Sequence, residues 1–128
     1  MKGREKTVSV KGRPYSRWGR IAAVRRKEYI AALEKLTALF PTPENYAELA
    51  QMQMENGAFD DADHTLCAME AQFPANESAW LLRLQFHVRQ HHGEAVHRMV
   101  QAAPDTGIYF SKKGREQIRF WSGETRTS

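Results

Sequence analysis

The fold of this chain is decided by residues 46–74, which read YAELAQMQMENGAFDDADHTLCAMEAQFP. Asn56-Gly57 interrupts the stretch with a pair that tolerates the left-handed backbone found at helix ends. Phe73-Pro74 closes it, because the residue before a proline is pushed out of the helical region. The stretch therefore predicts two helices, one ending near Glu55 and one running from Asp60 to Gln72.

The apolar and small residues of these two helices follow a fixed order. They read Tyr46-x2-Leu49-Ala50, then Ala62-x3-Leu66, then Phe73-Pro74. This order resembles the tetratricopeptide repeat, a helical hairpin of about 34 residues with the pattern W-x2-L-G, A-x3-F, P. The resemblance covers residues 43–74 and implies a module that holds a partner and performs no chemistry.

The resemblance weakens on both sides of this stretch. Trp80 follows Tyr46 by 34 residues and so occupies the first aromatic position of a second repeat. In that register Arg83 stands where the family has leucine. A shift of 33 residues in the other direction puts Tyr29 in the slot of the small residue, where its ring would prevent the usual close helix crossing. We therefore expect one good repeat flanked by two degenerate units.

Three further helices are predicted around the repeat. The first is capped by Ser16 and ends before Pro41, and its apolar residues recur at helical steps on one face: Ile21, Val24, Ile30, Leu33, Leu36 and Phe40. Thr42-Pro43 then starts the first helix of the repeat with a cap and a proline in the first turn. Asn76 caps a helix from Glu77 to Gln90, and a short fifth helix runs from Glu94 to Ala102.

The expected fold class is all-α, a short tetratricopeptide-like array of about five helices over residues 16–104. Residues 1–15 are expected to form a flexible basic arm, and residues 105–128 an extension that packs on the body and ends in a flexible tail. In that extension two apolar runs flank Lys112-Lys113-Gly114, which favours a small hairpin. The alternative is a short helix capped by Ser111, with Ile118 and Trp121 docked on the body.

Composition places the chain among globular proteins. Its 128 residues fit one domain, with 41% hydrophobic and 27% charged residues. No apolar run approaches the length of a membrane span and no secretory signal is apparent, so we expect no membrane association. Cys67 is the single cysteine, which excludes an internal disulfide and fits a cytoplasmic protein.

Charge is distributed unevenly along the chain. Residues 1–27 hold ten basic residues and one acidic residue, residues 28–105 hold four and twelve, and residues 106–128 hold five and two. The first segment therefore carries a net charge of +9, and its aromatic side chains lie among arginines, a pattern that binds phosphates and stacks on bases. The candidate nucleic-acid residues are Lys11, Arg13, Tyr15, Arg17, Trp18, Arg20, Arg25 and Arg26. A solvated N-terminus, or docking of the arm on the acidic body or on a partner, explains the same charges.

In the tetratricopeptide family, the first helix of each pair lines a concave groove that holds the partner. The matching positions here are Glu44, Ala47, Gln51, Met54, Glu55, Ser78, Leu81, Gln85, Val88 and Arg89. Family members that grip a terminal carboxylate use Lys and Asn on this face, and Ala47 and Gln51 occupy those slots, so we do not expect that mode. Apolar residues among acids favour an amphipathic or basic helix as the partner.

Four side chains have the spacing of zinc ligands on two neighbouring helices: His64, Cys67, His87 and His91. The alternative interpretation is that His91 lies at a frayed helix end and that Cys67 is a small core residue. We expect no metal and no cofactor. The chain also lacks a glycine-rich phosphate loop, an HExxH pair and a nucleophile elbow, so we expect no enzymatic activity.

Two functions remain open from the sequence. The first is a protein-interaction module, an adaptor or small chaperone, whose groove takes a helix or peptide of another protein. The alternative is a small nucleic-acid-binding regulator that uses residues 1–27 on the phosphates. A homo-oligomer is compatible with either function.

Overall fold

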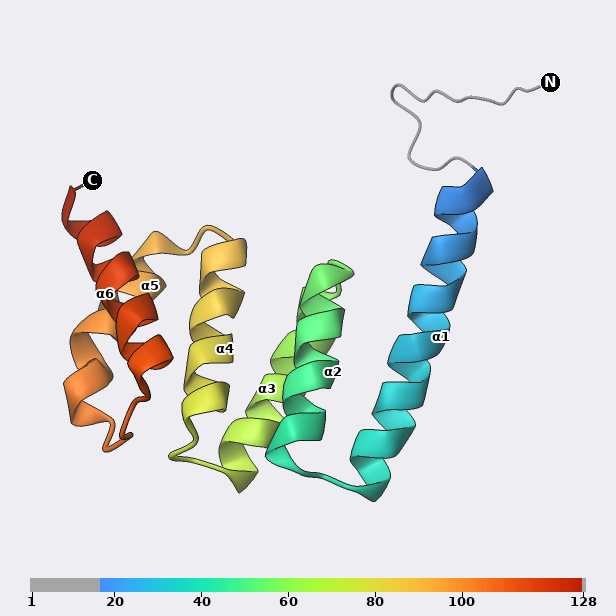
Figure 1. Cartoon of the computed structure of the whole chain (residues 1–128), viewed down its shortest axis with the longest axis horizontal. Coiled ribbons are helices and arrows are strands. Elements are labelled where there is room, and N and C mark those ends of the chain that lie inside the picture. Colours follow the sequence, from blue (N-terminus) through green and yellow to red (C-terminus); the bar gives the residue numbers. More distant parts are fainter. Residues whose placement is uncertain (1–16, 128) are drawn as a thin grey trace.

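The computed structural model describes the backbone of residues 17–127 and the side chains of residues 22–123. The described chain contains six α-helices, one short 3-10 helix and no strand, so the all-α prediction is confirmed (Figure 1). The elements are α1 (Arg17–Leu39), α2 (Pro43–Glu55), α3 (Phe59–Gln72), α4 (Glu77–Arg89), α5 (Gly93–Ala102), η1 (Ala103–Asp105) and α6 (Lys112–Thr127). The predicted arm, residues 1–15, lies outside the described residues.

The helix boundaries follow from local capping. The Asn45 backbone N–H donates to Thr42 Oγ1 at 3.1 Å, and the Ala79 backbone N–H donates to Asn76 Oδ1 at 3.0 Å. Each bond satisfies one of the N–H groups that a helix start leaves without a partner. Gly57 has a φ of +77°, a left-handed conformation that glycine adopts without steric cost.

The helices form a row that runs from α1 at one end to α6 at the other (Figure 1). Helix α2 packs against α1, α3 and α4, while α5 packs against α4 and α6. In the view of Figure 1, α3 and α5 lie behind α2, α4 and α6. Six helices packed in this order are compatible with a helical repeat.

The main core lies where α2, α3 and α4 meet, and most of its buried residues come from residues 46–74. Ala50, Ala62, Leu66 and Met69 are completely buried there. The Tyr46 and Phe73 rings meet edge to face with their centroids 6.3 Å apart. Tyr46, Ala50, Ala62 and Leu66 of the sequence pattern lie in this core, so the pattern marks residues that pack together.

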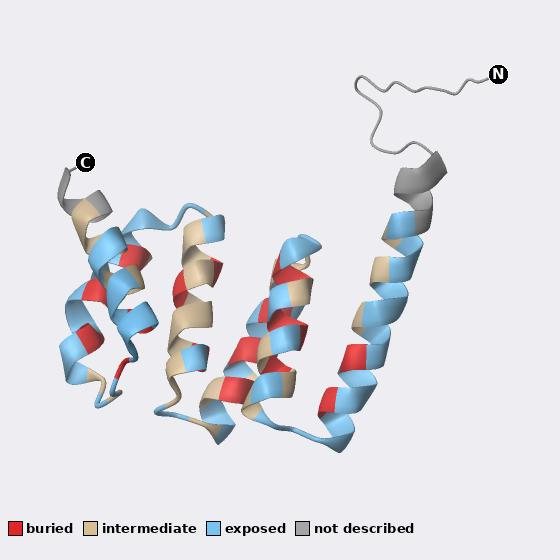
Figure 2. Ribbon diagram, in the orientation of Figure 1, coloured by how far each residue is buried: buried red, intermediate tan, exposed pale blue. Residues whose placement is uncertain are grey.

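Helix α1 differs from this core because most of its described surface is exposed (Figure 2). Leu33 and Thr37 are buried, whereas Leu36 and Phe40 are exposed and Val24 is 55% exposed. The prediction of one buried apolar face is therefore wrong for α1. Val24 and Leu33 are nine positions apart, which puts them on opposite sides of a helix.

Tyr29 lies on the side of α1 that meets α2. Its hydroxyl donates a hydrogen bond to Glu48 Oε2 on α2, and its ring remains partly exposed. The carboxylate raises the pKa of the Tyr29 hydroxyl, first through this hydrogen bond. The large side chain in the small-residue slot thus makes a polar link between the two helices.

The predicted C-terminal hairpin is wrong, because residues 112–127 form helix α6. Ser111 caps this helix, with the Gly114 N–H donating to its Oγ at 3.2 Å. The Ser111 N–H and hydroxyl in turn donate to Glu77 Oε2 at 3.0 and 2.7 Å. Gly114 is in the first turn of α6, where an added Cβ would lie 2.0 Å from the same Glu77 oxygen.

A second apolar cluster holds α6 against α4 and α5. Leu84, Val96 and Val100 are buried in it, and Ile118 and Trp121 of α6 pack against them. The docking of these two α6 residues agrees with the alternative that the sequence left open. No helix in the described part of the chain is long and apolar enough to cross a membrane.

Candidate partner-binding groove

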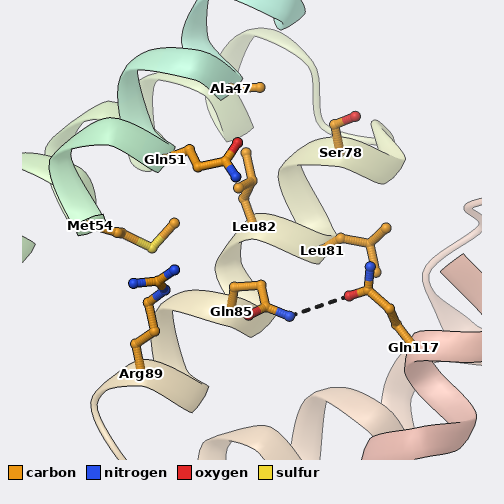
Figure 3. Close-up of a pocket in the computed structure, with 9 residues that line it drawn as sticks. All are labelled: Ala47, Gln51, Met54, Ser78, Leu81, Leu82, Gln85, Arg89 and Gln117. Carbon is orange, nitrogen blue, oxygen red and sulfur yellow. Dashed lines mark hydrogen bonds between the residues drawn. The ribbon is translucent and has the colours of Figure 1, made fainter. Parts of the chain in front are cut away.

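A hollow of about 370 Å³ lies between α2, α4 and α6. Nine described residues line it (Figure 3), namely Ala47, Gln51, Met54, Ser78, Leu81, Leu82, Gln85, Arg89 and Gln117. The hollow is open to solvent on one side, so it is a groove in the surface of the array.

Helical periodicity brings these side chains together. On α2, Ala47, Gln51 and Met54 follow one another at steps of four and three residues, which keeps them on one face. On α4, Gln85 and Arg89 continue the face that Leu81 begins, at steps of four. The packing of α2 against α4 then turns the two stripes into facing walls.

Seven of the ten positions inferred from the family line this hollow. Glu44 and Glu55 are exposed on α2 outside the lining. Val88 packs against the cluster of α4, α5 and α6 and so faces away from the groove. The acidic groove expected from the sequence is therefore a hollow without a carboxylate in its lining, and the acids lie on the same helix beyond it.

Two lining residues were missed by the sequence. Leu82 packs against the main core and also reaches the hollow. Gln117 comes from α6, and no signal within the sequence of α2 and α4 could place it there. Its position depends on α6 being a helix that docks beside α4.

The lining combines an apolar floor with amide groups. Met54 is only 3% exposed, and Leu81 and Leu82 are half-buried beside it. Gln51, Gln85 and Gln117 place three side-chain amides around this floor, with Gln85 Nε2 donating to Gln117 Oε1 at 3.3 Å (Figure 3). An amide side chain both donates and accepts hydrogen bonds, as a peptide backbone does.

Arg89 is the charged residue among the nine that line the groove. Its guanidinium is exposed at the C-terminal end of α4, next to Met54 and Gln85 in the lining (Figure 3). The nine lining residues include no carboxylate. The groove therefore complements an anionic group more readily than a basic one.

A second hollow continues the groove along α6. It has a volume of about 370 Å³ and shares Gln85 and Gln117 with the first. Phe120 and Trp121 line it, and Phe120 is exposed. Lys113 and Glu116 also line the second hollow, so the two hollows together present apolar, amide and charged groups from α2 to α6.

The four candidate zinc ligands do not converge. His64 lies in a different hollow with Thr37 of α1, and His87 Nδ1 is 3.4 Å from His92 Nδ1. His91 has a φ of +61° just beyond α4. Within the residues that the structure describes, no group of three or more His, Cys, Asp or Glu side chains could hold a metal ion.

Cys67 is exposed, so its interpretation as a core residue is wrong. Its Sγ lies 3.6 Å from Arg83 Nη2 and 3.8 Å from Asp63 Oδ1. The thiol therefore belongs to a polar cluster on the surface of α3 and α4.

Arg83, which stands where the tetratricopeptide pattern would have leucine, is accommodated by contacts with acidic and aromatic side chains. Its guanidinium pairs with Asp63 at 2.7 Å and Glu70 at 2.9 Å, and it lies 5.0 Å from the centre of the Phe86 ring. Burial by itself lowers the pKa of Arg83, but the hydrogen bonds to Glu70 and Asp63 outweigh it and raise the pKa. Arg83 thus links α3 to α4 through charge.

Two of the nucleic-acid candidates have described side chains. Arg26 donates from Nη1 to Asn56 Oδ1 at 3.5 Å, which directs it toward the end of α2. Arg25 is exposed on α1. The side chains of Lys11, Arg13, Tyr15, Arg17, Trp18 and Arg20 lie outside the described residues.

Comparison with known proteins gives no match at the level of a protein-family model, a curated protein or a solved structure.

Proposed function

We propose that this protein is a tetratricopeptide-like interaction module that binds a peptide or helix of a partner protein in the groove between α2, α4 and α6. The observation that carries the proposal is the lining of that groove, an apolar floor surrounded by three amides and one guanidinium. The lining holds one hydroxyl, that of Ser78, but no His, Cys, Asp or Glu that could activate it, so it suits recognition better than catalysis.

The lining defines the chemistry of the partner segment. An apolar side chain of the partner fills the floor at Met54, Leu81 and Leu82. Backbone amides of the partner exchange hydrogen bonds with Gln51 and Gln85. An Asp or Glu nearby pairs with Arg89. An adaptor or small chaperone acts through a site of this kind, and the lone cysteine fits work in the cytoplasm.

The proposal is tested by panning random phage-displayed peptides on the full chain and measuring affinities of the enriched peptides by isothermal calorimetry. We expect enriched peptides to carry an apolar residue close to an Asp or Glu. Leu81→Glu and Arg89→Glu should each weaken their binding about tenfold or more, because both change the chemistry of the lining.

The matched control for Arg89→Glu is Arg98→Glu, since Arg98 is an exposed arginine of α5 outside the groove. It should leave the affinity unchanged. Peptides that bind Leu81→Glu and Arg89→Glu as tightly as the original chain would contradict the proposal.

A second candidate function rests on the charge of residues 1–27, with ten basic residues and one acidic residue. A regulator that binds nucleic acid through this segment should lose affinity steeply with salt, because binding releases counterions from the phosphates. The measurement is fluorescence anisotropy of a single-stranded and a duplex oligonucleotide across a salt series. Removal of residues 1–15 takes away five of the ten basic residues and should weaken binding strongly, whereas Leu81→Glu should leave it unchanged.

A further inference from the structure

The side of α1 that faces away from α2 carries a stripe of exposed apolar and charged side chains. Val24 is 55% exposed and Leu39 is 73% exposed near its two ends. Between them, exposed side chains continue the stripe on the same side of the helix, namely Glu28, Ala31, Ala32 and Lys35. Nothing in the described chain covers this side, which we call the outer face of α1.

We propose that the outer face of α1 binds the same face of a second copy of this chain, with the two helices antiparallel and the two-fold axis passing between Ala31 and Ala32. The residues of the face are arranged symmetrically about that point. A two-fold axis there brings together positions whose numbers add to 63, so each contact occurs twice.

The charged members of the face are complementary in this arrangement. Glu28 meets Lys35 of the second copy, and Lys35 meets its Glu28. Val24 meets Leu39 of the second copy in the same way, so that exposed apolar side chains cover one another at both ends. At the centre, alanines allow the two backbones to approach closely.

Charge also selects the antiparallel orientation. A parallel pair in register would place Glu28 against Glu28 and Lys35 against Lys35. It would also bring the basic run of residues 25–27 beside its own copy. The antiparallel pair puts the two basic runs at opposite ends, and it opposes the two helix dipoles favourably.

This interface leaves the groove open, because the groove is lined by α2, α4 and α6 and contains no α1 residue. A dimer would therefore present two grooves, and a partner with two binding segments would gain avidity from both. The contact from Val24 to Leu39 covers roughly 22 Å of helix at 1.5 Å per residue, which corresponds to a weak interface.

The first experiment is sedimentation equilibrium of the full chain from micromolar to submillimolar concentration. We expect a reversible monomer–dimer equilibrium. Glu28→Lys alone and Lys35→Glu alone should each weaken it about tenfold, because each places like charges in two symmetric contacts. The double variant, Glu28→Lys with Lys35→Glu, should regain the original affinity.

An equimolar mixture of the two single variants sharpens the test. Glu28→Lys has lysine at both positions and Lys35→Glu has glutamate at both, so the mixture should form heterodimers at the original affinity. Lys112→Glu is the matched control, since Lys112 is an exposed lysine at the other end of the array, and it should change nothing. Circular dichroism melts establish that each variant is folded.

Orientation is tested by oxidation in a Cys67→Ser background. Ala31→Cys should form a disulfide-linked dimer, as should a mixture of Val24→Cys with Leu39→Cys. Val24→Cys alone should form none, because the two positions are about 22 Å apart in the antiparallel pair. A chain that stays monomeric overturns the proposal and leaves the outer face to a helix of another protein. A dimer unaffected by the single charge variants, or one linked by Val24→Cys alone, overturns it as well.

Discussion

At the C-terminal end of the array, α6 turns Ile118 and Trp121 against the cluster of α4 and α5 while Arg115 and Arg119 remain in solvent. At the N-terminal end, α1 buries Leu33 but leaves Val24 and Leu39 exposed. Helical arrays need terminal helices with polar outer faces to stay soluble. Helix α6 meets this condition except at Phe120, which is exposed, whereas α1 leaves both Val24 and Leu39 exposed, so α1 is the end where a further surface is expected to bind.

The largest expected effect compares one leucine from each end. Leu84 is completely buried where α4, α5 and α6 meet, so Leu84→Ala should lower the free energy of unfolding by about 2–5 kcal/mol. Leu39→Ala removes the same atoms from an exposed site and should change it by less than about 0.5 kcal/mol for the monomer. Urea denaturation at dilute concentration measures both. Equal losses would mean that the two ends are covered alike.

A smaller effect concerns the start of α6. In Gly114→Ala the new Cβ meets Glu77 Oε2, so the carboxylate must move and give up one of its two hydrogen bonds to Ser111. Loss of a hydrogen bond to a charged group costs about 1.5–3 kcal/mol, while alanine in place of glycine returns about 1 kcal/mol in a helix. The net result should be a destabilisation of about 1 kcal/mol in thermal or urea unfolding.

The sign of this effect should reverse when Glu77 is changed first. In a Glu77→Ala background no carboxylate is left to displace, and Gly114→Ala should stabilise the chain by about 0.5–1 kcal/mol. The same sign in both backgrounds would show that Glu77 does not hold the start of α6.

The smallest expected effect is a pH dependence at the junction of α4 and α5. Burial lowers the pKa of His87, with the Arg83 and His92 charges adding to it. The unfolded chain therefore binds a proton at His87 more readily than the folded chain does. As a result the folded state loses stability as the pH falls below about 6.5, the ordinary pKa of histidine. Unfolding free energy should decrease from pH 7.5 toward 5.5, and His87→Gln should flatten that slope. The described α1 contains no histidine, so its end contributes nothing to the slope.

Much of the fold could be predicted from short-range patterns. The predicted first helix ends before Pro41 and the observed α1 ends at Leu39, while α3 and α4 end within one residue of their predicted limits. The cap bonds at Thr42 and Asn76 join residues only three positions apart. Seven of the ten groove positions matched from the tetratricopeptide pattern line the hollow, because residues at helical spacing stay on one face whichever way the helix packs.

The parts that were missed depend on distant neighbours. The run Lys112-Lys113-Gly114 reads as a turn, and Glu77, 34 residues before Ser111, is what holds the start of the helix. Val88 lies on the apolar side of α4, and it packs against the cluster that α4 forms with α5 and α6 instead of lining the groove. Gln117 reaches the groove only because α6 docks beside α4.

The sequence by itself determined where the helices begin and end and which residues could share a face. Those properties depend on caps, prolines, glycines and a periodicity of a few residues, all of which are local. Only the tertiary structure decided which faces are covered, that α6 closes one end and that α1 leaves the other open. Coverage is a contact between elements far apart in the chain, and a face with the same apolar spacing is buried or exposed according to whether a neighbour lies against it.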